Sequence, residues 1–169
     1  MRNFLLPVAA GLLMAAPAAA ETTTRDLEVI GRALGFVENQ SGSERVLAII
    51  HDAASAGEAE ALLASLGGGL RAGRVTLTGR LVNSADLSGL DGAHAAVLLG
   101  SVAGNASVAQ TVNSAGILSV SSDMGCVEVQ GCVMGVQSAP SVRIVVNRAN
   151  AGAASVSFAA AFAMMIEEI

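Results

Sequence analysis

The chain has 169 residues and a net charge of −5, and it contains no lysine, tryptophan or tyrosine. This acidic balance argues against binding to nucleic-acid phosphates, and the scarcity of aromatic rings argues against sites that stack bases or sugars. The aliphatic side chains, within a hydrophobic fraction of 53%, are sufficient to form one buried core.

The first twenty residues have the pattern of a secretory signal peptide. A positive start at Met1–Asn3 precedes an apolar run at Phe4–Ala16 and the small residues of Pro17–Ala20. We therefore expect residues 1–20 to be removed and residues 21–169 to form a single exported domain, either periplasmic or secreted. The apolar run is short for a membrane span, so we expect no direct membrane insertion.

Helical and strand patterns alternate through most of the remaining chain. Helices are expected at 22–38, 55–66 and 107–114, and strands at 45–51, 74–82, 95–100 and 116–121. This alternation predicts an α/β sandwich with a largely parallel central sheet flanked by helices. Beyond Asp123 we expect an antiparallel hairpin with strands at 127–137 and 141–147, and then a closing helix over 156–169.

Cys126 and Cys132 lie six positions apart, and no pair of histidines lies near them. In an oxidising compartment this spacing favours a disulfide over a metal site, and we expect neither a metal nor a cofactor. The bond would be either a structural staple or a redox-sensitive clip. It would fix a candidate partner-binding loop that consists of Val127, Glu128, Val129, Gln130 and Gly131.

Polar residues follow several of the expected strands, and ligands of parallel sheets bind beyond the carboxyl ends of strands. The candidate ligand crevice comprises His51, Asp52, Ser101 and Asp123. Hydrolysis would require Ser101 or Ser121 within hydrogen-bond reach of His51. No G-x-S-x-G turn surrounds either serine, so the protein is not expected to be an enzyme.

The second half of the chain resembles the YfiR-like family. The segment 116–126, with sequence GILSVSSDMGC, is similar to the family pattern ILTVSD-x-x-G-F, and 142–149 is similar to VRFEIN-x-x-A. In this chain Cys126 replaces the family's aromatic residue, and Ile144-Val145 replaces its Phe-Glu pair. The agreement in order and spacing extends over about 97–169.

The resemblance implies an exported α/β protein that forms homodimers and carries a disulfide in this hairpin region. It also implies a regulatory binding protein that restrains an inner-membrane diguanylate cyclase by contact with the cyclase's periplasmic sensor domain. The affinity difference between two states of such a partner would be sufficient for regulation. The alternative hypothesis is a periplasmic small-molecule binding lobe of the solute-receptor type.

Overall fold

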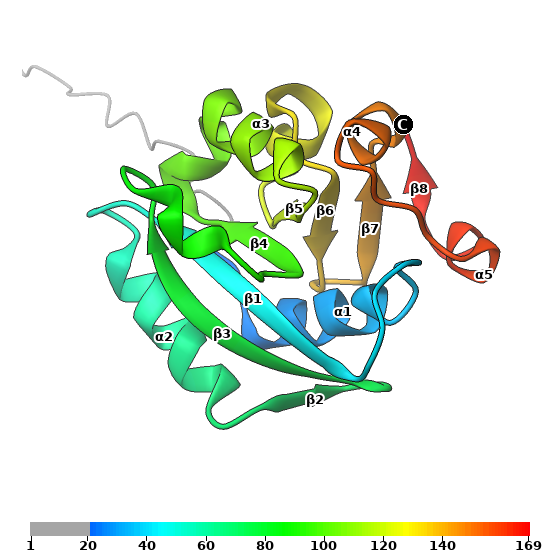
Figure 1. Cartoon of the computed structure of the whole chain (residues 1–169), viewed down its shortest axis with the longest axis horizontal. Helices are drawn as coiled ribbons and strands as arrows, with labels where there is room; N and C mark the ends of the chain where they lie inside the picture. The colour runs from blue at the N-terminus through cyan, green and yellow to red at the C-terminus, as the bar shows by residue number, and fades with distance from the viewer. Residues whose placement is uncertain (1–20) are drawn as a thin grey trace, which may run out of the picture.

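The computed structural model describes residues 21–169, so the expected signal peptide at 1–20 lies outside the described residues. One sheet of eight strands runs through the domain in the order β2-β3-β1-β4-β5-β6-β7-β8 (Figure 1). The strands are β1 (Glu44–His51), β2 (Leu70–Ala72), β3 (Val75–Asn83), β4 (Ala95–Leu98), β5 (Leu118–Ser121), β6 (Met134–Gln137), β7 (Arg143–Val146) and β8 (Glu167–Glu168). Strands β3, β1, β4, β5 and β6 are mutually parallel, whereas β2 and β7 each pair antiparallel with their inner neighbour.

Helices and short helical turns cover both faces of the sheet. The α-helices are α1 (Thr24–Leu34), α2 (Ala56–Leu66), α3 (Ala106–Ser114), α4 (Arg148–Ala153) and α5 (Ala160–Ala163). Shorter turns occur at η1 (Leu87–Leu90), η2 (Gly100–Gly104) and η3 (Cys126–Gln130). Figure 1 shows α1 and α2 on the opposite side of the sheet from α3.

Strand β1 shows how the sheet supplies two separate cores. Leu47 and Ile49 belong to the core beneath α1 and α2, whereas Ala48 and Ile50 belong to the core beneath α3. Side chains alternate between the two faces of a strand, so a continuous apolar run fills both layers. This explains why the run Val46–Ile50 lacks polar positions.

Helix α1 begins with a capping box and packs closely against the sheet. Thr23 Oγ1 accepts from the N–H of Asp26, and Asp26 Oδ2 accepts from the N–H of Thr23. Further along the helix, a Cβ atom added at Gly31 would lie 2.5 Å from Cβ of Ala72. The absence of a side chain at Gly31 therefore allows α1 to approach β2.

The predicted fold class is confirmed: a mostly parallel sheet is flanked by helices and followed by an antiparallel pair, β6–β7. The predicted bounds of two elements were wrong. The expected strand at 127–137 begins only at Met134, because the preceding residues form the turn η3. The expected closing helix over 156–169 is reduced to α5, and Glu167–Glu168 instead pairs with the outer edge of β7.

Within residues 21–169, no helix is both long enough and apolar enough to cross a membrane.

Candidate functional site

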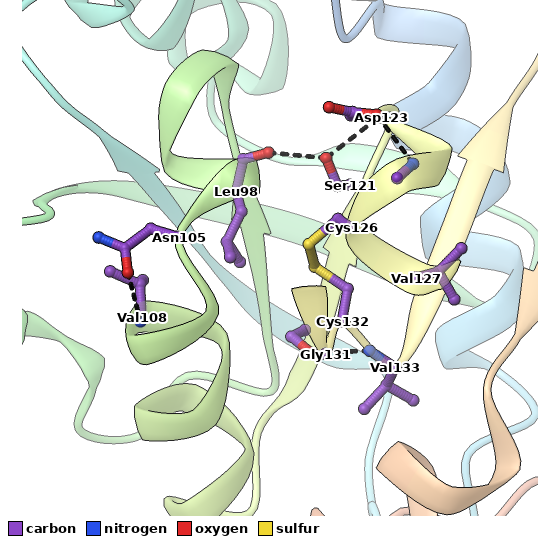
Figure 2. Close-up of a disulfide and its surroundings, with 12 residues drawn as sticks. Leu98, Asn105, Val108, Ser121, Asp123, Cys126, Val127, Gly131, Cys132 and Val133 are labelled. Atoms are coloured by element: carbon purple, nitrogen blue, oxygen red, sulfur yellow. Dashed lines mark hydrogen bonds between the residues drawn. A yellow bond between two sulfur atoms is a disulfide. The ribbon is translucent and has the colours of Figure 1, made fainter. Parts of the chain in front are cut away.

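Cys126 and Cys132 form a disulfide across the turn η3, with their Cα atoms 5.2 Å apart (Figure 2). The turn lies in the connection between β5 and β6, and not at the tip of the β6–β7 hairpin. Both cysteines are fully buried, in the same core cluster as Leu98 and Val108. Gly131 ends the turn with a φ of +100°, a conformation that favours glycine.

Three asparagines, which the sequence analysis did not single out, hold this turn from outside. The side-chain amides of Asn113, Asn147 and Asn150 donate to the carbonyl oxygens of Gly131, Val127 and Cys132, at 2.7, 3.2 and 3.0 Å. Each bond satisfies a carbonyl group that no regular ladder would pair. Of the three, Asn147 is the one that the sequence could have indicated, because it is similar in position to the asparagine of the pattern VRFEIN-x-x-A.

The structure divides the candidate partner-binding loop into buried and exposed residues. Val127 is fully buried, so its assignment to a partner-binding surface was wrong. Glu128 is exposed, and Val129 has 76% of its surface exposed, whereas Gln130 and Gly131 are partly exposed. The surface that the turn presents therefore consists mainly of one acidic and one aliphatic side chain.

Two of the crevice residues, Asp52 and Ser101, meet at the carboxyl ends of β1 and β4. The Ser101 hydroxyl donates to Asp52 Oδ2, while Asp52 Oδ1 accepts from the N–H and the hydroxyl of Ser55, at 2.9 and 2.8 Å. In the sheet, β3 lies on one side of β1 and β4 lies on the other, so the chain changes sides between β3 and β4. The carboxyl ends of β1 and β4 therefore flank the switch point at which open α/β sheets bind ligands. Both carboxylate oxygens are thus engaged by neighbouring groups of the protein.

The other two crevice residues do not join this pair. His51 Nδ1 lies 3.1 Å from the carbonyl oxygen of Asp52, and Asp123 Oδ1 accepts from the N–H of Gly125 at 2.9 Å. The Ser121 hydroxyl donates to the carbonyl oxygen of Leu98. In the hydrogen bonds of the described residues, His51 is paired with neither serine, so this structure does not assemble the arrangement that hydrolysis requires.

The hydrogen bonds to Asp52 should make the stability of the protein depend on pH in the acid range. The Ser101 hydroxyl, and then the hydroxyl and N–H of Ser55, lower the pKa of Asp52 from 3.8 to about 2. A carboxyl group with a lowered folded-state pKa stabilises the fold above its unfolded pKa and loses that contribution as the pH falls. We expect the stability advantage over Asp52→Asn to be constant above about pH 5 and to shrink between pH 3.8 and about 2.

Urea unfolding of both proteins across this pH range would measure the effect. Ser101→Ala provides the control, because it keeps the carboxyl group and removes its largest stabilising donor. This variant should retain only part of the dependence on pH. A parallel decline of the native protein and Asp52→Asn would contradict the assignment.

Four cavities within residues 21–169 lie away from this pair. One of 410 Å³ and one of 180 Å³ flank the segment Glu21–Thr23, and two others, of 320 and 250 Å³, border α5. None of these four is lined by His51, Asp52, Ser101 or Asp123. Across residues 21–169 there is also no group of three or more His, Cys, Asp and Glu side chains arranged to hold a metal ion.

Comparison with known proteins informs the fold alone. No family model and no curated protein matches the sequence. Among solved structures, a conserved domain protein from Vibrio cholerae O1 biovar El Tor is similar, with a TM-score of 0.59 and 12% sequence identity. The similarity covers 86% of this chain and 59% of that protein, so the chain matches little more than half of its length.

Proposed function

We propose that the protein is a periplasmic regulatory binding protein of the YfiR-like kind, which restrains an inner-membrane signalling protein of the diguanylate cyclase type. The observation that carries this proposal is the turn η3, where a buried disulfide fixes the backbone beneath an exposed Val129. A surface that is ordered before binding loses less conformational entropy on association. The series of motifs between 97 and 169 supports the choice of partner class.

The proposal assigns restraint to binding and not to catalysis. The serines and the histidine considered for hydrolysis form separate hydrogen bonds within the described residues. A regulator of this kind needs only a higher affinity for the inactive state of its partner than for the active state. The rigid turn would supply that selectivity through its shape.

Self-association is a further part of the proposal. An apolar groove of 250 Å³ lies between α1, β7 and α5, and it is lined by Val29, Arg32, Ala33, Phe36, Val142, Ile144, Phe162 and Met165. Val142 and Met165 have 51% and 56% of their surfaces exposed. A second copy of the chain would remove this apolar surface from water.

The test is to replace Val129 by aspartate and measure capture of inner-membrane periplasmic sensor domains. A charge at the centre of the docking surface should weaken binding by about tenfold or more, with stability changed by less than about 0.5 kcal/mol. Met164→Asp is the matched control, because Met164 is also apolar and has 90% of its surface exposed, but lies in the C-terminal segment. Equal binding by both variants, or no captured partner for the native protein, would refute the proposal.

A further inference from the structure

His94 comes just before β4 and connects three segments at the start of the parallel strands. Its N–H donates to the carbonyl oxygen of Val46 at 2.8 Å, and its Nδ1 accepts from the N–H of Val46 at 3.1 Å. Its own carbonyl oxygen accepts from the side-chain amide of Gln40 at 3.2 Å. This one residue therefore joins β1, the start of β4 and the segment that precedes β1.

The bond at Nδ1 determines where the ring carries its proton. A backbone N–H can only donate, so Nδ1 of His94 must offer a lone pair, and the proton of the neutral ring must lie on Nε2. A second proton on the ring would occupy that lone pair and point at the N–H of Val46. Protonation of His94 therefore removes this hydrogen bond and sets two donors against each other.

A buried arginine lies beside this bond in the sequence of β1. Arg45 has 3% of its surface exposed, and its guanidinium group holds a strap that we define as residues 40–44. It donates to the carbonyl oxygens of Gln40, Ser41, Gly42 and Glu44, at 3.0, 3.1, 3.0 and 2.9 Å. A guanidinium group keeps its charge throughout the ordinary pH range, so a protonated His94 would be a second cation at this edge of the sheet.

The charged groups around His94 oppose its protonation. Burial, and then the Arg45 cation, lower the pKa of His94 from 6.5. The adjoining segments also carry Glu44 at the start of β1, Asp91 in the loop before His94, and Arg80 on β3, which donates to the carbonyl oxygen of Asp91. None of them forms an ion pair with His94 in the described part of the chain, and residues 116–118 at the start of β5 carry no charge.

We propose that His94 is a pH-sensitive latch, which holds the strap 40–44 to the sheet while its ring is neutral and releases it when the ring is protonated. Histidine is the side chain whose charge ordinarily changes near neutral pH, so the latch responds to mild acidification. Protonation frees the amide of Val46 and loosens the link between Gln40 and His94. The latch does not depend on the proposed regulatory role.

The direction of the pH dependence follows from the lowered pKa of His94. The unfolded chain, in which this pKa has its ordinary value of 6.5, binds the proton before the folded protein does. The contribution of His94 to stability is therefore present above pH 6.5 and is lost as the pH falls below that value. Local opening at Val46 should follow the same course, because the opened ring is also free to bind a proton.

The experiment is hydrogen exchange of the Val46 amide, measured by NMR on the protein expressed from its full sequence. Between about pH 7.5 and about pH 5.5, the range in which histidine titrates, protection relative to the unstructured chain should fall by about tenfold. This is the scale of one lost hydrogen bond. At neutral pH, the nitrogen shifts of the His94 ring should show a proton on Nε2 and none on Nδ1.

His94→Asn separates the charge of the ring from its role as an acceptor. The side-chain oxygen of asparagine can accept the N–H of Val46 from nearly the position of Nδ1, but it does not titrate. This variant should therefore keep the same protection at Val46 at both pH values. His51→Asn is the matched control, because His51 is the other histidine of the chain and lies at the opposite end of β1. It should lose protection at Val46 as the native protein does.

Three results would overturn the proposal. They are a proton on Nδ1 of His94 at neutral pH, constant protection of Val46 in the native protein, and the same loss of protection in His94→Asn as in the native protein. The first two are measured on the native protein, so they test the latch even if His94→Asn does not fold.

Discussion

Replacing Phe162 by alanine should destabilise the protein by about 3–5 kcal/mol, the usual cost of removing a buried phenylalanine. Phe162 has only 2% of its surface exposed, and its ring lies 5.3 Å from that of Phe36 and 4.9 Å from that of Phe158. Helix α5 has four residues, too few to be stable without packing. Loss of this ring should therefore release the C-terminal segment from α1.

Urea unfolding would give the change in stability, and hydrogen exchange would locate it. The amide of Ile169 donates to the carbonyl oxygen of Val146 at 3.0 Å and should lose protection in Phe162→Ala. Met164→Ala, two residues along at a position with 90% of its surface exposed, should change stability by less than about 0.5 kcal/mol. Similar effects for the two variants would show that the aromatic cluster does not anchor the segment.

Removal of the disulfide by the double substitution Cys126→Ala and Cys132→Ala should cost about 2–4 kcal/mol. A closed loop of this length contributes about 2 kcal/mol on the chain-entropy account, and loss of the buried sulfur atoms adds to it. Asn113, Asn147 and Asn150 still bond the turn, so we expect the fold to survive. Urea unfolding measures the difference.

The burial of both sulfurs also distinguishes the staple from the redox clip. Because Cys126 and Cys132 are fully buried, dithiothreitol should leave the bond intact in the folded protein and reduce it in concentrated urea. Free-thiol counting under both conditions measures this contrast. Reduction of the folded protein as fast as in urea would instead favour the redox-sensitive clip.

The main errors in the sequence analysis concern segments where a long-range contact overrides a local pattern. The turn signal at 138–140 predicts a hairpin whose first strand covers 127–137, but the disulfide and the positive φ of Gly131 bend the start of that segment into a turn. The spacing of Phe158, Phe162, Met165 and Ile169 favoured a helix. The structure instead extends the chain after Met165 so that β8 pairs with the otherwise open edge of β7.

The candidate sites were predicted in part. Chain order placed Asp52 and Ser101 at one edge of the sheet, and the structure brings them into contact. Chain order does not show that Ser55 completes the set of hydrogen bonds around Asp52, because its position in the sequence indicates only the start of a helix. His94 stands beside Asp91 and Gly92 just before β4, a sequence context that predicts a solvated loop histidine. In the structure its Nδ1 accepts from the N–H of Val46, and its pKa is lowered by burial and then by Arg45.

The sequence by itself determined the succession of the main helices and strands along the chain, the largely parallel character of the sheet and the cysteine pair. These features depend on local periodicity and on spacing along the chain, which are written directly in the residues. Tertiary structure decided which side of the η3 turn is buried, how the C-terminal segment packs, and which groups surround His94. Those outcomes depend on contacts between residues far apart in the chain, such as Gln40 with His94, and no local pattern encodes them.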